Sequence, residues 1–301
     1  MEQLKSVDYT QANQLYQSVY VERAALQENA KQEFTPITNV ATHEDLKTMA
    51  EQFDKLGYEA IARGEVAVCI MSGGQGTRLG FNHPKGMFDL NLKSGLTLFG
   101  YFAHRLQRLD ELARKHSNLQ KEGALIKWYL MTSEMNHKEV VGYFEANNYF
   151  GYDKNAIVFF PQGGIPAMTY QGKIVIESES SLSLAPGGNG AIYGEMRRNK
   201  VLDHMKEHGV KYIYLGPVDN VLLKVADPTS LGYMIKHEFD IVSHYLKKRS
   251  ADEKVGLHLK VNGKVKILEY SETDAKVKEE KDAKGEFVYK HGARATMYIT
   301  R

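Results

Sequence analysis

Short apolar segments alternate with longer helical patterns through the middle of this chain, and this alternation limits the folds that it can adopt. The segments VAVCIM (66–71), IKWYLMT (126–132) and AIVFF (156–160) have the length and composition of buried strands. Helical patterns follow the first two of them, over Leu96–His116 and Lys138–Asn147. Because parallel strands need a crossover connection, usually a helix, this order predicts an α/β fold, with a mostly parallel mixed sheet and helices on both faces.

The flanking parts of the chain add further elements around this centre. Thr42 is a favourable N-cap for a helix that closes near Gly57 or Gly64. We therefore divide the chain into an N-terminal helical segment, 1–60, and one larger domain, 61–301. The sequence also predicts an amphipathic N-terminal helix over about Lys5–Lys31, a strand YIYLGPV (212–218), helices over about Ala191–His208 and Ser230–His237, hairpins that turn at Gln171–Gly172 and Asn262–Gly263, and a solvated loop in the charged run 272–286.

Composition narrows the class of protein. The 39 basic and 37 acidic side chains leave a net charge of +2, so no global positive field points to a nucleic-acid partner. Cys69 is the only cysteine, which excludes an internal disulfide and fits a reducing compartment. No segment reaches the roughly 20 apolar residues that span a bilayer, so we expect no membrane partner and a cytoplasmic location.

The stretch MSGGQGTRLGFNHPKG (71–86) places five glycines and two cations directly after the first predicted strand. Glycine backbone N–H groups can approach a phosphate closely because no Cβ obstructs them. The stretch is neither a Walker A loop, since Lys85 is followed by Gly86 and not by Ser or Thr, nor a Rossmann fingerprint, since Leu79 occupies the position of the third glycine. It therefore predicts a phosphate-binding turn of another kind.

The string G-G-x-G-T-R-L, with Lys85 seven residues after Arg78, resembles the signature of nucleotide-sugar pyrophosphorylases. It is similar in particular to the eukaryotic UDP-N-acetylglucosamine pyrophosphorylases, and the resemblance extends over about residues 35 to 272. It implies a Rossmann-like nucleotidyltransferase fold, with an N-terminal helical extension and without the C-terminal part of the family. The segments that carry it are GGQGTRLGFNHPKGM, WYLMTSE, PQGGIPAM, KIVIESESSLSLAPGGNGAIY, YIYLGPVDN and KVKILEYSE.

This resemblance implies a uridylyltransferase that converts UTP and N-acetylglucosamine 1-phosphate to UDP-N-acetylglucosamine and pyrophosphate, with Mg²⁺ as cofactor. The attacking phosphate oxygen is already anionic, so the protein has to hold two anions together and neutralise their charge. Two alternatives stay open: a UDP-glucose or broad UDP-sugar pyrophosphorylase, and a catalytically silent relative that binds a UDP-sugar. Monomer and homodimer also stay open.

The resemblance further implies which residues form the site. The nucleotide contacts are Met71, Ser72, Gly73 and Gly74, and the catalytic residues are Arg78, which binds the departing pyrophosphate, and Lys85, which lies at the reacting phosphate. Asp219 is the metal ligand. The base and the sugar are bound by Gln162 at the uracil edge, Gly188 and Asn189 at the base and the N-acetyl sugar, and Glu269 at the sugar hydroxyls.

Simpler interpretations compete with some of these roles, and the chain departs from the family at several positions. Asn189 is equally a candidate helix N-cap, and Glu269 an outward-facing strand residue. Ala293 follows Gly292 where the family has a sugar-positioning asparagine, and Gly187 replaces a family aspartate. The chain ends where family members continue to a phosphate-binding lysine, so altered sugar selectivity and a lower rate are expected.

Overall fold

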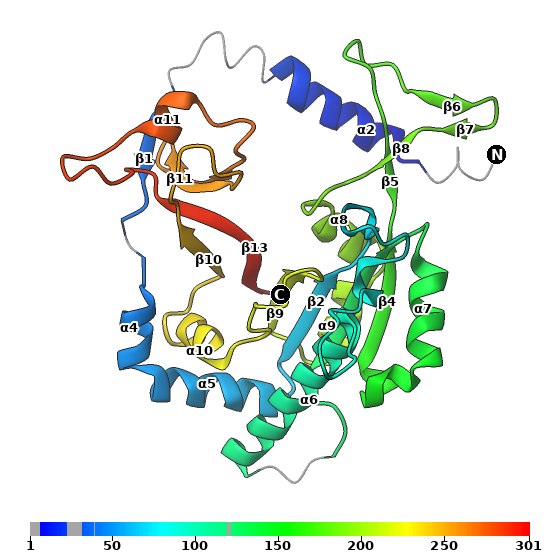
Figure 1. Cartoon of the computed structure of the whole chain (residues 1–301), viewed down its shortest axis with the longest axis vertical. Coiled ribbons are helices and arrows are strands. Elements are labelled where there is room, and N and C mark those ends of the chain that lie inside the picture. Colours follow the sequence, from blue (N-terminus) through cyan, green and yellow to red (C-terminus); the bar gives the residue numbers. More distant parts are fainter. Residues whose placement is uncertain (1–6, 23–31, 39, 119–121) are drawn as a thin grey trace.

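The computed structural model describes residues 7–22, 32–38, 40–118 and 122–301, which build a nine-stranded mixed sheet (Figure 1). The strands are β1 (Phe34–Pro36), β2 (Val66–Met71), β3 (Lys127–Ser133), β4 (Ile157–Gln162), β9 (Tyr212–Pro217), β10 (Ile241–Lys247), β11 (Leu257–Val261), β12 (Lys264–Leu268) and β13 (His291–Thr300). Their order along the sheet is β1-β11-β13-β9-β2-β3-β4, with β12 pairing to β11 and β10 to β13.

The centre of the sheet is parallel, as the alternating sequence pattern predicts. β2 pairs in parallel with β3 on one side and with β9 on the other, and β3 continues to β4. The remaining pairs, beginning with β13 against β9, are antiparallel. The sequence does not predict β1, β10 or β13 as strands, because these segments form by pairing with partners that are distant along the chain.

Helices cover both faces of the sheet, which confirms the predicted α/β class. Val66, Val68 and Ile70 of β2 pack into one core, whereas Ala67 and Cys69 pack into the other. This alternation follows the period of two along a strand. The first face is covered by α5 (Ala50–Ala62), α6 (Leu98–Ser117), α7 (His137–Ala146) and α10 (Pro228–Lys236), and the second by α8 (Ala191–Arg198) and α9 (Val201–Glu207).

Two predicted helices are each divided in the structure. Thr42 caps a helix as predicted, in a capping box with Asp45, but this helix is the short α4 (His43–Thr48), and α5 begins only after Met49 leaves the helical conformation. The predicted helix 191–208 is α8 and α9, because Lys200 between them takes a positive φ of 55°. A single continuous helix at either place is therefore wrong.

The charged run 272–286 is not only a solvated loop, contrary to the sequence-based prediction. It contains the short helix α11 (Ala275–Glu279), whose N-terminus is capped by the Asp274 side chain and whose Val277 is buried in a small core with β11. The predicted hairpin turn at Asn262–Gly263 is confirmed, since β11 and β12 pair on either side of it.

The predicted N-terminal helix is present within the described residues as α2 (Tyr9–Tyr16), followed by a π-helical turn over Gln17–Glu22. Residues 23–31 of that prediction lie outside the described residues. Figure 1 shows α2 beside an arm that extends from β4, and the Tyr16 hydroxyl donates to the Tyr170 carbonyl oxygen at 2.8 Å. The arm contains β5 (Gly164–Pro166), β6 (Ile176–Ser178), β7 (Ser181–Leu182) and β8 (Leu184–Pro186).

The same arm contains the hairpin predicted at Gln171–Gly172, confirmed by an antiparallel bridge between Met168 and Ile174. The division of the chain at residue 60 stays a prediction; it falls inside α5, whose last residues Ala60–Ala62 pack in the core of the larger unit. Among the helices of the described residues, none has both the length and the apolar character needed to cross a bilayer.

Candidate active site

The glycine-rich stretch forms a tightly held turn at the carboxyl end of β2. Its start is fixed to β3, because the Ser72 N–H donates to the Met131 carbonyl oxygen at 2.8 Å. Its middle is closed on itself by the Lys85 N–H, which donates to the Gly74 carbonyl oxygen at 3.1 Å. Within the described part of the chain, no group accepts a hydrogen bond from the N–H of Gly73 or Gly74. The turn thus keeps two backbone donors available for a ligand.

Lys85 reaches across the sheet edge to Asp219. Its Nζ lies 2.8 Å from Asp219 Oδ2, and the two side chains are 25% and 44% exposed, respectively. Asp219 follows β9, which is the parallel neighbour of β2, and the Val218 N–H donates to the Met71 carbonyl oxygen at 3.1 Å. The structure therefore brings together a cation and a carboxylate that are 134 residues apart in sequence.

Gln162 is the third predicted residue at this edge. It ends β4, is buried, and is the register partner of Ser133 at the end of β3. Its amide nitrogen lies 3.0 Å from where a Cβ on Gly73 would be. The glycine-rich turn with its Lys85, Asp219 and Gln162 thus meet where four parallel strands end, the usual ligand-binding edge of an open α/β sheet.

The described contacts do not join the other predicted residues to this group. Gly188, with a positive φ of 67°, and Asn189 are exposed in the turn before α8. The N-cap of α8 is Gly190, without a side-chain hydrogen bond, so the interpretation of Asn189 as an N-cap is wrong. The structure places the Arg78 backbone in a 3-10 turn over Thr77–Leu79, and the Arg78 side chain lies outside the described residues.

Glu269 lies just past the end of β12, near the residue that replaces the family asparagine. Its Oε1 is 3.5 Å from where a Cβ on Gly256 would be. The Ala293 N–H donates to the Gly256 carbonyl oxygen at 2.6 Å. Glu269 and Ala293 therefore border the same glycine, on the antiparallel side of the sheet, and Glu269 is not a residue of a strand.

The donors at the edge fit a magnesium ion shared with phosphates. Among the described residues, no three His, Cys, Asp or Glu side chains cluster in a way that could hold a metal alone. Mg²⁺ is commonly bound by one or two carboxylates together with substrate phosphates and water. The half-exposed Asp219 side chain offers one such carboxylate.

Several residues that support the turn escape the sequence-based prediction. Asn136 is fully buried and donates from Nδ2 to the Ser72 carbonyl oxygen at 3.2 Å. His83, inside the turn, contacts Glu139 of α7, with Nδ1 to Oε1 at 2.6 Å. The segment SEMN (133–136), which begins at the last residue of β3, has the composition of a polar turn, and this is the only local signal for Asn136. Nothing local points to Glu139.

One titratable group near this edge has a shifted pKa. His137 begins α7 and its Nδ1 lies 2.8 Å from the Thr132 hydroxyl of β3. Burial lowers the pKa of its imidazole, so the ring is neutral at pH 7. The His137 imidazole therefore contributes a hydrogen bond to Thr132 and no positive charge near the glycine-rich turn.

The sequence matches a family described as UTP--glucose-1-phosphate uridylyltransferase over residues 10–291. It is 37% identical over 293 residues to a probable UDP-N-acetylglucosamine pyrophosphorylase of Dictyostelium discoideum, covering 96% of this chain and 60% of the relative. It is 41% identical over 235 residues to UDP-N-acetylglucosamine pyrophosphorylase of Saccharomyces cerevisiae, covering 78% of this chain and 48% of the relative. The chain thus spans about half the length of the curated relatives it matches.

Solved structures show the same fold. The UDP-N-acetylglucosamine pyrophosphorylase of Trypanosoma brucei superposes with a TM-score of 0.87 at 30% identity, covering 99% of this chain and 59% of the other. A putative UDP-N-acetylglucosamine pyrophosphorylase of Entamoeba histolytica gives 0.81 at 34% identity, covering 89% and 66%. A UDP-glucose pyrophosphorylase of Leishmania major, at 17% identity and a TM-score of 0.69, shares the fold alone. The predicted nucleotidyltransferase-like α/β fold is confirmed.

Proposed function

Since the chain belongs to the UTP–glucose-1-phosphate uridylyltransferase family, we propose that it transfers the uridylyl group of UTP to a sugar 1-phosphate. N-Acetylglucosamine 1-phosphate is the proposed acceptor, because the relatives at 37% and 41% identity are named for that sugar. The products are then UDP-N-acetylglucosamine and pyrophosphate.

One observation carries this proposal: the Lys85–Asp219 pair beside the two available N–H groups of Gly73 and Gly74. Backbone donors and a cation at a turn after a parallel strand can bind a triphosphate. The adjacent carboxylate supplies a place for the counter-ion of that triphosphate.

The proposed step needs no nucleophilic side chain. A phosphate oxygen of the sugar 1-phosphate forms a bond to the α-phosphorus of UTP, and the bond from that phosphorus to the bridging oxygen breaks, with the electron pair leaving on pyrophosphate. Lys85 is placed to offset the negative charge that spreads over the reacting phosphoryl group. The Gly73 and Gly74 N–H groups orient the nucleotide phosphates. The pyrophosphate-binding role of Arg78 stays part of this proposal.

Magnesium is the proposed cofactor, and Asp219 is the residue that would hold it together with phosphate oxygens. Such an ion neutralises phosphate charge and orients the leaving group. Lys85 keeps the Asp219 carboxylate at the sheet edge through their 2.8 Å contact.

Different residues are proposed to recognise the base and the sugar. Gln162 is proposed to read the uracil edge, because an amide offers both a donor and an acceptor. Gly188 and Asn189 are proposed to approach the base and the N-acetyl group, and Glu269 to accept from sugar hydroxyls. Ala293 beside Glu269 has no side-chain hydrogen-bonding group, so glucose 1-phosphate belongs in the same assay as a competing acceptor.

An assay of pyrophosphate exchange tests the function. With UTP and Mg²⁺, we expect the full chain to turn over N-acetylglucosamine 1-phosphate. Lys85→Ala should lower kcat about 10²- to 10³-fold, because a preorganised charge at the reacting phosphate is lost. UTP affinity, measured by calorimetry, should fall far less, since the glycine N–H groups remain.

Lys115→Ala is the matched control, since Lys115 is an exposed lysine in the last turn of α6. It should leave kcat unchanged. Equal losses of kcat and UTP affinity in Lys85→Ala would contradict the assigned role of Lys85. Turnover of glucose 1-phosphate instead would reassign the acceptor, and binding of UDP-sugars without any turnover would establish the catalytically silent alternative.

A cytoplasmic location remains part of the proposal. Its support is the single cysteine, Cys69, which lies fully buried as a free thiol in the second core. Burial raises the pKa of this thiol well above its usual value, so it is an inert apolar residue and not a reactive one.

A further inference from the structure

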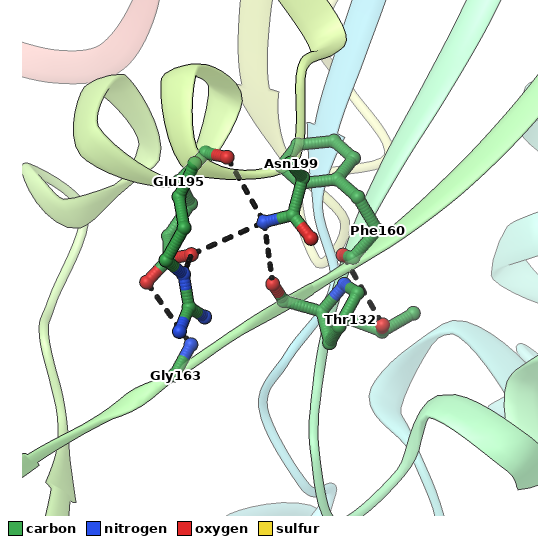
Figure 2. A network of polar contacts seen from close by, with 7 residues as sticks. Thr132, Phe160, Gly163, Glu195 and Asn199 are labelled. Carbon is green, nitrogen blue, oxygen red and sulfur yellow. Dashed lines mark hydrogen bonds and ion pairs between the residues drawn. The ribbon is translucent and has the colours of Figure 1, made fainter. Parts of the chain in front are cut away.

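The end of β4 is held at two positions, by Glu195 of α8 and by Asn199, the residue that directly follows α8. Glu195 Oε1 accepts a hydrogen bond from the Gly163 N–H at 3.0 Å. Asn199 Nδ2 donates to the Pro161 carbonyl oxygen at 3.1 Å. Figure 2 shows the Glu195 and Asn199 side chains beside this strand end. Gln162 is the residue between the two held positions.

The Glu195 carboxylate is itself held in place by neighbouring polar groups. Its side chain is 14% exposed, and its second oxygen, Oε2, accepts from Arg198 Nε at 2.8 Å and lies 3.2 Å from Asn199 Nδ2. A carboxylate that is mostly removed from water needs such partners. Hydrogen bonds to an ionised acceptor are stronger than hydrogen bonds between neutral groups. The contact from the Gly163 N–H to Glu195 therefore holds the backbone at this position.

The placement of Gln162 is set by the backbone that Glu195 and Asn199 contact. No hydrogen bond within the described residues holds its side-chain amide, although the residue is buried. The backbone of β4, which pairs with β3 and is also held by Glu195 and Asn199, places the amide against Gly73. A shift of the backbone between Pro161 and Gly163 therefore moves the amide directly.

We propose that Glu195 and Asn199 are positioning residues for nucleobase selection. They hold the Pro161–Gly163 backbone so that the Gln162 amide meets the uracil edge beside the nucleotide turn. Uracil offers a carbonyl oxygen and an N–H where cytosine offers an amino group and a bare ring nitrogen, so discrimination requires that the amide keep its packing against Gly73 and not rotate by about 180°. This inference rests on the proposed function and adds to it the source of its base specificity.

The test compares UTP with CTP as substrates of the full chain. Glu195→Ala removes the acceptor of the Gly163 N–H, and we expect KM for UTP to rise about tenfold while kcat changes less than about threefold. The ratio of kcat/KM for UTP to that for CTP should fall about tenfold. Asn199→Ala should act in the same direction, and Glu195→Gln, which keeps an acceptor oxygen, should retain most of the selectivity.

Glu207→Ala is the matched control, because Glu207 is an exposed glutamate at the end of α9. A purely structural role of Glu195 would lower the melting temperature of Glu195→Ala and leave the UTP to CTP ratio unchanged, and this result would overturn the proposal. If Glu195→Ala does not fold, Asn199→Ala carries the same test, with Glu195→Gln as the variant that should keep the selectivity.

Different results would overturn the positioning role of Glu195 and Asn199 and the proposed function. Wild-type turnover of UTP with an unchanged ratio of UTP to CTP in Glu195→Ala and Asn199→Ala overturns the positioning role alone. A wild-type chain that neither turns over nor binds UTP overturns the proposed function and, with it, the positioning role.

Discussion

Lys85 and Asp219 form a partly exposed ion pair, and the role proposed for it is in chemistry and not in folding. Exposed pairs contribute about 0–1 kcal/mol to stability, because water screens their attraction and both side chains lose conformational freedom. With exposures of 25% and 44%, this pair belongs near that class. We therefore expect this pair to contribute little to stability.

Asp219→Asn tests this separation of roles. The variant should lower kcat at least about 10²-fold and raise the Mg²⁺ concentration for half-maximal activity at least about tenfold, because an anionic oxygen donor is lost. The free energy of unfolding should change by less than about 1 kcal/mol. Magnesium titrations of the activity, together with urea unfolding, measure both effects. An unchanged magnesium response would exclude Asp219 as the metal ligand.

At the scale of elements, α5 and α10 cross with their backbones in direct contact. A Cβ on Gly232 of α10 would lie 1.8 Å from the Phe53 carbonyl oxygen of α5. A Cβ on Gly57 of α5 would lie 2.1 Å from the Pro228 carbonyl oxygen of α10. Each helix thus presents a glycine to the other, and this contact attaches α5 to the first face of the sheet.

Gly232→Ala should destabilise the protein by about 2–3 kcal/mol, because the methyl group forces the two helices apart. Gly142→Ala is the control, since Gly142 lies inside α7 with no atom within 4 Å of the added Cβ. That variant should stabilise the protein by up to about 1 kcal/mol, through higher helix propensity. Urea unfolding followed by circular dichroism measures both, and equal effects would argue against close contact between α5 and α10.

At the scale of the whole molecule, a buried carboxyl group couples stability to pH. Asp110 of α6 accepts hydrogen bonds from the N–H groups of Leu125 and Ile126, at 3.1 and 3.2 Å, and from the Tyr152 hydroxyl at 3.3 Å. Burial raises its pKa to about 6, although these hydrogen bonds oppose the shift. The folded state therefore binds the Asp110 proton more tightly than the unfolded state, whose carboxyl has a pKa of about 3.9.

The sign of the pH effect follows from this raised pKa. The stabilising contribution of the proton is present at low pH and is lost as the pH rises through about 6. Relative to Asp110→Asn, which carries no ionisable group there, the wild-type chain should gain about 2 kcal/mol between pH 7 and pH 4. Urea unfolding of both proteins at several pH values measures the difference. A difference that stays constant with pH would mean that Asp110 is not the group responsible.

Local chemistry determined much of what this sequence predicts correctly. Asn262 and Gly263 both take positive φ values, of 50° and 77°, as a two-residue hairpin turn requires. Thr42 with Asp45 forms the capping box that starts α4. Alternating helical and strand patterns between 66 and 160 were sufficient to predict three parallel strands and both crossover helices. The reason is that hydrophobic periodicity and turn residues can be recognised within a few neighbouring residues.

Long-range contacts decided what the sequence could not. The pairing of β10 with β13 joins segments that are about 50 residues apart, so no local pattern predicts it. The same is true of the site: the glycine turn and Asp219 are visible in the sequence, but Lys85 meets Asp219 only because β9 pairs with β2. Glu195 resembles any helical glutamate until α8 packs beside the end of β4. A side chain acquires such a role from the partners that folding brings to it, and those partners can be any number of residues away.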